Sequence, residues 1–106
     1  MRIGIVGGLD RNARELEAMA SAVGHQLEVH TGVLAGHASA SGLRALVARA
    51  DLILILTDIN SHNAVRMARR HARLQNRPCR IMRRLGITQF AALLQGLRAP
   101  GGAVAA

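Results

Sequence analysis

Three histidines occupy positions from which an imidazole could bind a metal. His30 ends a stretch of alternating polar and apolar residues, His62 follows the polar cluster at residues 57–61, and His71 lies within an arginine-rich segment. The positive end of a helix that begins beside His62 disfavours the imidazolium form there and favours the neutral, ligating form. A histidine that only forms hydrogen bonds in a turn is the competing interpretation of His62.

His71 belongs to a helical pattern that separates apolar residues from basic ones. Met67 and His71 share the apolar face, and arginines fill most of the remainder: Arg66, Arg69, Arg70, Arg73 and Arg77. Haem requires one or two axial ligands, an apolar slot and cations for its propionates. The alternative is a core or interface histidine. The residues expected at a haem site are the possible axial or distal histidines, a pocket-wall methionine and the propionate-binding arginines: His30, His62, His71, Met67, Arg11, Arg66 and Arg83.

Four apolar segments, each followed by a helical pattern, would position these residues. The expected strands cover residues 2–6, 26–31, 52–57 and 79–82, and the expected helices cover residues 11–23, 41–50, 61–76 and 88–97. The apolar run at residues 52–56 is typical of a buried parallel strand. Right-handed crossovers then predict an α/β fold: a small parallel four-stranded sheet with flanking helices and strand order 2-1-3-4.

This pattern is that of a Rossmann-like or flavodoxin-like half domain. We expect a single domain over residues 1–98 and a disordered tail over residues 99–106. Residues 32–40 are expected to form a flexible loop. The predicted N-caps of the first three helices are Asp10, Ser41 and Ser61, and Gly24 is expected to end the first helix.

The expected strand order brings two polar clusters together at the switch point of the sheet, where α/β folds bind ligands. These are Gly7-Gly8 with Arg11, and residues 57–62. The alternative to haem is therefore a small regulatory module that binds a phosphorylated metabolite or nucleotide in this crevice. The dinucleotide fingerprint lacks its third glycine, and Ser61 is better explained as a helix cap than as a nucleophile. We accordingly expect a protein that is not an enzyme.

The basic composition predicts acidic partners. All fourteen basic residues are arginine, and the formal net charge is +8. A third alternative is thus an arginine-rich interaction or nucleic-acid contact protein, although Phe90, the sole aromatic residue, offers little stacking surface for single strands. The small core favours a homodimer. The single cysteine, Cys79, suits a reducing cytoplasm and an inert strand thiol, and no apolar stretch reaches the roughly 20 residues of a membrane span.

Four groups of residues carry a resemblance to a known family: Ile-Val-Gly-Gly-Leu-Asp-Arg at 5–11, Gly24-His25 with Glu28-Val29-His30 and Gly32, Thr57-Asp58 with Ser61-His62, and the basic helix leading to Arg77-Pro78. The resemblance is to a small bacterial family, the domain of unknown function 2325. It covers roughly residues 2–83 and implies a compact Rossmann-like domain, with no particular activity implied by the family's name. We expect a cysteine near position 71 in many relatives, so His71 suits a histidine-ligated subgroup.

Overall fold

The computed structural model describes residues 1–8, 12–32, 34, 37–58 and 60–98. Strands and helices alternate along this part of the chain: β1 (Arg2–Val6), α1 (Ala13–Ala22), β2 (Gln26–His30), α2 (His37–Arg49), β3 (Leu52–Leu56), α3 (His62–Leu74), β4 (Cys79–Met82) and α4 (Ile87–Arg98). The strands form one parallel sheet with the order β2-β1-β3-β4. The predicted α/β class and strand order are confirmed.

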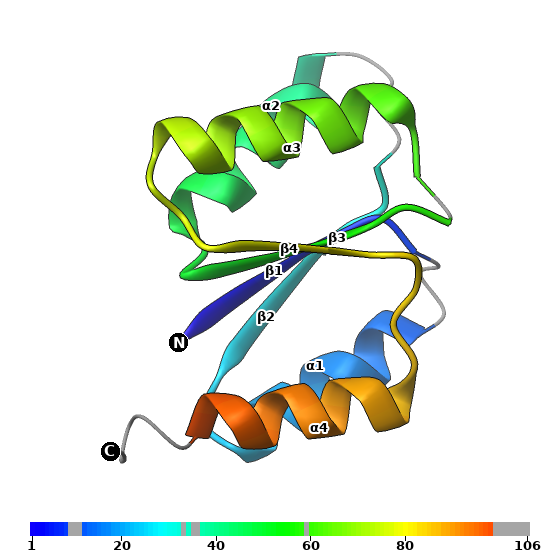
Figure 1. Ribbon diagram of the computed structural model, residues 1–106, viewed down its shortest axis with the longest axis vertical. Coiled ribbons are helices and arrows are strands. Elements are labelled where there is room, and N and C mark those ends of the chain that lie inside the picture. Colours follow the sequence, from blue (N-terminus) through cyan, green and yellow to red (C-terminus); the bar gives the residue numbers. More distant parts are fainter. Residues whose placement is uncertain (9–11, 33, 35–36, 59, 99–106) are drawn as a thin grey trace.

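The sheet is covered on both faces. Helices α2 and α3 lie together on one side, and α1 and α4 lie together on the other (Figure 1). Strand β3 contributes side chains to the cores on both faces of the sheet, because successive side chains of a strand point to opposite faces. Leu54 packs on the α1/α4 side and Ile55 on the α2/α3 side, and every residue of β3 is buried. This explains why the strand is apolar throughout.

The two cores are filled differently. On the α1/α4 side Phe90 is fully buried and is the largest of the fully buried side chains among the described residues. On the α2/α3 side, helix α3 buries a row of alanines four residues apart: Ala64, Ala68 and Ala72. Small side chains in one row let this helix approach the sheet closely. The apolar residues Met67 and Leu74 are therefore left beside the buried face of α3 and not on it.

Helix α2 begins earlier than the sequence predicted. It starts at His37, within the segment that we expected to be a loop up to residue 40. Ser41 consequently lies inside the helix, and its hydroxyl accepts a hydrogen bond from Arg44 Nη2 at 3.3 Å instead of acting as the cap. Alanine is the strongest helix former, and alternating alanines at 38 and 40 favour the longer helix.

The other helix ends agree more closely with the predictions. Gly24 follows α1 with φ of +84°, and the Ser61 hydroxyl accepts a hydrogen bond from the Ala64 amide at 3.1 Å, so both predicted signals are confirmed. Helix α1 starts at Ala13 with Asn12 at the N-cap position. The predicted cap Asp10 and the tail at residues 99–106 lie outside the described residues.

Within the described part of the chain, we find no helix that combines the length and the apolar character needed to cross a bilayer.

Candidate functional site

Two adjacent residues, Asn60 and Ser61, join the loops that follow β1, β2 and β3. The Asn60 amide nitrogen Nδ2 donates to the carbonyl oxygens of Val6 at 3.2 Å and of Leu56 at 2.7 Å, and its Oδ1 accepts from the Ser61 amide at 2.8 Å. The Ser61 hydroxyl in turn donates to the Gly32 carbonyl at 2.8 Å. This network links the carboxyl ends of three strands at one edge of the sheet.

A pocket of about 610 Å³ opens at this edge, on the α1/α4 side of the sheet. We call it the edge pocket. Its lining is made of aliphatic side chains from the sheet and α1, the glycine turn after β1, and residues that follow β3 and β4: Ile5, Gly7, Gly8, Asn12, Ala13, Leu16, Val29, Leu56, Asp58, Arg83, Arg84, Leu85 and Gly86. The described residues of this lining include no histidine, so the histidines that we predicted at the switch point do not meet here.

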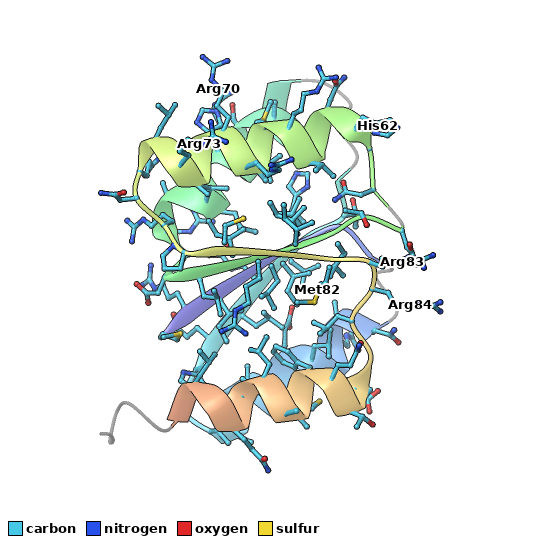
Figure 2. All side chains as sticks on the ribbon, in the orientation of Figure 1. His62, Arg70, Arg73, Met82, Arg83 and Arg84 are labelled. Atoms are coloured by element: carbon cyan, nitrogen blue, oxygen red, sulfur yellow. The ribbon has the colours of Figure 1, made fainter. Side chains whose placement is uncertain are left out.

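Asp58 anchors two arginines at the rim of the edge pocket. Arg83 Nε lies 3.3 Å from Asp58 Oδ1, and Arg84 Nε lies 3.5 Å from Asp58 Oδ2. The Asp58 amide also donates to the Arg83 carbonyl at 2.8 Å. Both arginine side chains project outward at this end of the sheet (Figure 2). Asp58 therefore pairs with the segment that follows β4.

His30 lies at the end of β2, but its ring faces the α2 side of the sheet. Its Nδ1 accepts a hydrogen bond from the Gly32 amide at 3.0 Å, and its Nε2 lies 2.9 Å from the Ser39 carbonyl oxygen. Since Nδ1 accepts, Nε2 must carry the proton and donate, which defines a neutral tautomer. Iron ligation by His30 would require one of these two hydrogen bonds to break.

His62 is the first residue of α3 and is exposed. Its side chain points away from the body of the protein at the end of the helix (Figure 2). His62 precedes His71 by nine residues, which corresponds to about 13.5 Å along a helix axis. The two histidines of one chain therefore cannot bind the same iron from the same helix.

A second concavity, of about 920 Å³, runs along α3 beside the start of α2. We call it the α3 groove. It is lined by apolar residues, one histidine, one asparagine and four arginines: Leu34, Ala40, Asn63, Arg66, Met67, Arg69, Arg70, His71, Arg73 and Leu74. Three of the predicted haem-site residues, Arg66, Met67 and His71, come together here. Arg83 lies at the edge pocket, and Arg11 is outside the described residues.

The fold shifts the pKa values of two further groups, the Cys79 thiol and the Glu28 carboxyl. Burial raises the pKa of the half-buried Cys79 thiol, an effect that the positive charge of Arg69 partly opposes. The hydrogen bond from Arg49 lowers the pKa of Glu28; Arg49 Nε donates to Glu28 Oε1 at 2.9 Å. Glu28 is thus engaged with the last residue of α2 and is not among the residues that line the edge pocket.

Among the described residues, no three histidine, cysteine, aspartate or glutamate side chains gather as a protein-only metal site would require. A haem site differs in this respect because its iron is already held by the porphyrin and needs only one protein ligand. The chemistry of the α3 groove, with one imidazole, one thioether, aliphatic side chains and arginines, fits such a group.

Sequence reasoning placed Asn60 at the switch point within residues 57–62 but gave it no role, and it missed Arg84 and Leu85. The position of Asp58 on the α1/α4 side could have been predicted from the alternation of β3. Residues 52, 54 and 56 face that side, and residue 58 is the next even-numbered position after the strand. The position of Arg84 depends on where β4 ends relative to β3. The predicted strand order makes β3 and β4 neighbours, but no local signal in the sequence sets the register between them.

The molecule is a doubly wound α/β protein with a pocket beyond the carboxyl ends of its strands. Residues 2–97 match the family model described as an uncharacterized protein conserved in bacteria (DUF2325), and the chain belongs to this family. This confirms the resemblance seen in the sequence. Comparison with curated proteins finds no match, and comparison with solved structures finds none either.

Proposed function

We propose that the protein is a non-enzymatic, cytoplasmic haem-binding protein, that haem lies in the α3 groove, and that His71 is its axial ligand. The observation that carries the proposal is the meeting of His71, Met67 and four arginines around one apolar concavity. A bound haem would supply an iron centre for carrying or sensing dioxygen or another small ligand. The side chains of the groove would hold the haem and balance its charge.

His71 is well placed to act as a ligand. It lies one helical turn after Met67, so the two side chains project from the same side of α3. His71 is half-buried, whereas His62 at the end of the same helix is exposed. A half-buried imidazole beside a thioether and leucines offers a nitrogen at the boundary of an apolar slot, which an iron porphyrin requires.

The arginines of the groove supply the charge that haem propionates need. Arg66, Arg70 and Arg73 are exposed and line the same concavity as His71. Arg70 and Arg73 project from the outer surface of α3 (Figure 2). Guanidinium groups bind carboxylates through two parallel hydrogen bonds and keep their charge at all physiological pH values. Two propionates would offset part of the excess positive charge of this helix.

The openness of the groove supports the expected homodimer. Leu74, at the end of α3, is 68% exposed, which is high for a leucine beside an apolar concavity. A haem held by His71 in this groove would stay partly exposed to solvent. A second copy of the chain could cover the exposed part, and the propionates would reduce repulsion between the two arginine-rich helices. Dimerisation is therefore expected to depend on haem.

Hemin titration of the purified protein tests the proposal. We expect a shifted Soret band with the wild-type chain and its loss in His71→Ala. The matched control is His62→Ala, which removes a histidine from the same helix about 13.5 Å away and should leave the spectrum unchanged. Arg70→Gln/Arg73→Gln should weaken hemin binding roughly tenfold through loss of charged hydrogen bonds.

Two results would contradict the proposal. One is the absence of a Soret shift with the wild-type chain. The other is an unchanged spectrum when His30, His62 and His71 are all replaced by alanine. Loss of the Soret band in His62→Ala but not in His71→Ala would move the site to the tip of α3. Size-exclusion chromatography with and without hemin separates haem-dependent dimers from monomers.

A further inference from the structure

We propose that the edge pocket is a second ligand site, separate from the α3 groove, and that it binds an organic phosphate. Arg83 and Arg84 would hold the phosphate, and the aliphatic floor of the pocket would hold the uncharged part of the ligand. The site goes beyond haem binding, because its residues, its location and its ligand chemistry are all different.

The floor of the pocket is built to receive an apolar body. Leu56, Val29 and Ile5 reach it from three neighbouring strands, while Leu16 and Leu85 close it from α1 and from the segment before α4. A volume of about 610 Å³ far exceeds what an inorganic anion occupies. Ligand sites typically combine such an apolar lining with a few polar groups that fix the orientation of the ligand.

The rim carries a pair of cations in a defined arrangement. Asp58 contacts the Nε atom of both Arg83 and Arg84, and these contacts engage one edge of each guanidinium group. The two arginine side chains are 80% and 79% exposed, whereas Asp58 is 32% exposed. The carboxylate thus contacts both guanidinium groups while most of each arginine side chain remains exposed. Since Asp58 offsets only one of the two arginine charges, the rim keeps a net positive charge that attracts a phosphate.

The backbone on the opposite side of the pocket leaves room for the ligand. Gly7 and Gly8 have φ values of +105° and +90°, a conformation that other residues rarely adopt. Asn12 occupies the N-cap position of α1, but its side chain does not cap that helix. The positive end of α1 thus adds to the attraction of an anion that Arg83 and Arg84 already bind.

The two sites can be tested independently because they lie on opposite faces of the sheet. The edge pocket lies on the α1/α4 side, whereas the α3 groove lies on the side covered by α2 and α3 (Figure 1). The described linings share no residue. Failure at one site therefore does not imply failure at the other.

Titration with 1-naphthyl phosphate, followed by amide NMR and by the fluorescence of the probe, tests the proposal. We expect saturable binding with the largest shifts at Gly7, Gly8 and Leu85. Inorganic phosphate and 1-naphthol, which each supply half of the probe, should bind at least tenfold more weakly. Arg83→Gln/Arg84→Gln should lower the affinity roughly tenfold or more. The control Arg44→Gln/Arg80→Gln removes the same charge outside both linings and should change it by less than twofold.

Equal affinity in the wild type and in Arg83→Gln/Arg84→Gln would overturn the proposal, as would the absence of saturable binding. Shifts confined to α3 would assign the phosphate to the arginines of the groove and would also overturn it. His71→Ala should bind the probe as the wild type does, and Arg83→Gln/Arg84→Gln should give the wild-type Soret band with hemin. These crossed measurements separate this site from the proposed haem site.

Discussion

The amide side chain of Asn60 occupies the space where any side chain at Gly32 would begin. A Cβ atom built on Gly32 would lie 2.0 Å from Asn60 Oδ1 and 2.8 Å from Asn60 Cγ. Gly32 also has φ of +89°, where a Cβ atom is strained whatever the space around it. The glycine after β2 and the asparagine after β3 therefore fit together as a pair. This contact lets Asn60 reach the carbonyl groups at the ends of β1 and β3.

Asn60→Ala should destabilise the protein by about 2 kcal/mol, because the carbonyls of Val6 and Leu56 would lose their side-chain donor. Urea denaturation measures the change. The matched control is Asn63→Ala, at an exposed position on α3, which should alter the free energy of unfolding by less than about 0.5 kcal/mol. Equal losses in the two variants would show that the hydrogen bonds of Asn60 do not stabilise the fold.

Gly32→Ala should cost about 2 kcal/mol or more, since the left-handed backbone conformation and the collision with Asn60 both oppose a Cβ atom. The cost should be smaller in an Asn60→Ala background, where the collision is removed, and a double-mutant cycle measures this coupling. Gly96→Ala is the control, because in the described part of the chain no atom lies within 4 Å of the added Cβ apart from the adjoining residues and the backbone of α4 itself. It should stabilise the protein by about 0.5–1 kcal/mol. Additive effects at Gly32 and Asn60 would argue against the pair.

Cys79 should react slowly in the folded protein. Burial raises the pKa of its thiol and so lowers the fraction of the reactive thiolate. We expect Ellman's reagent to modify the folded chain at least about tenfold more slowly than the urea-unfolded chain, after correction with glutathione in the same urea concentrations. The sequence contains one cysteine, so the signal reports this residue alone. Similar corrected rates in both states would show that the thiol is open to solvent.

His25 should make the fold less stable in acid. Its pKa lies below the ordinary value of 6.5, first because burial desolvates the ring and second because the Met1 ammonium adds positive charge. Met1 nitrogen lies 2.8 Å from His25 Nδ1, and His25 Nε2 is buried with no partner among the described atoms. Between the lowered pKa and 6.5 the unfolded chain binds more protons than the folded chain. The stability contributed by the neutral ring is therefore fully present above pH 6.5. It falls as the pH drops, until the pH is below the pKa of His25 in the folded protein.

Urea titrations of the wild type and His25→Gln at pH 8, 7, 6 and 5 test this expectation. The difference in free energy of unfolding between the two proteins should shift in favour of the variant as the pH falls. The other histidines titrate in both proteins, so the comparison isolates position 25. Parallel stability curves would contradict the prediction.

The predictions made from the sequence succeeded where one short segment carries its own signal. The unbroken apolar run of β3 indicated a central parallel strand, and Ser61 and Gly24 marked helix ends through interactions within their own turn. The predicted start of α2 was wrong because a serine inside a helix can resemble an N-cap residue. Local sequence does not distinguish the two when alanines precede it.

The position of the candidate sites depended on relations that no local pattern contains. Asp58 meets Arg83 and Arg84 only because β3 and β4 are paired and end at the same edge of the sheet. His30 was predicted as a ligand from its place at the end of β2, but strand alternation turns its ring toward Ser39 and engages both nitrogens. The direction of the His30 side chain and its hydrogen-bond partners follow from the assembled sheet.

The sequence by itself determined the order of elements, the parallel sheet and its strand order. Hydrophobic periodicity reports secondary structure, and the handedness of crossovers leaves few ways to connect it. Only the tertiary structure decided that the helix face with His71 and Met67 borders a groove, and that Asp58, Arg83 and Arg84 meet at the edge pocket. The physical reason is that a row of small alanines turns one side of α3 to the sheet, and packing, not periodicity, chose which side that is.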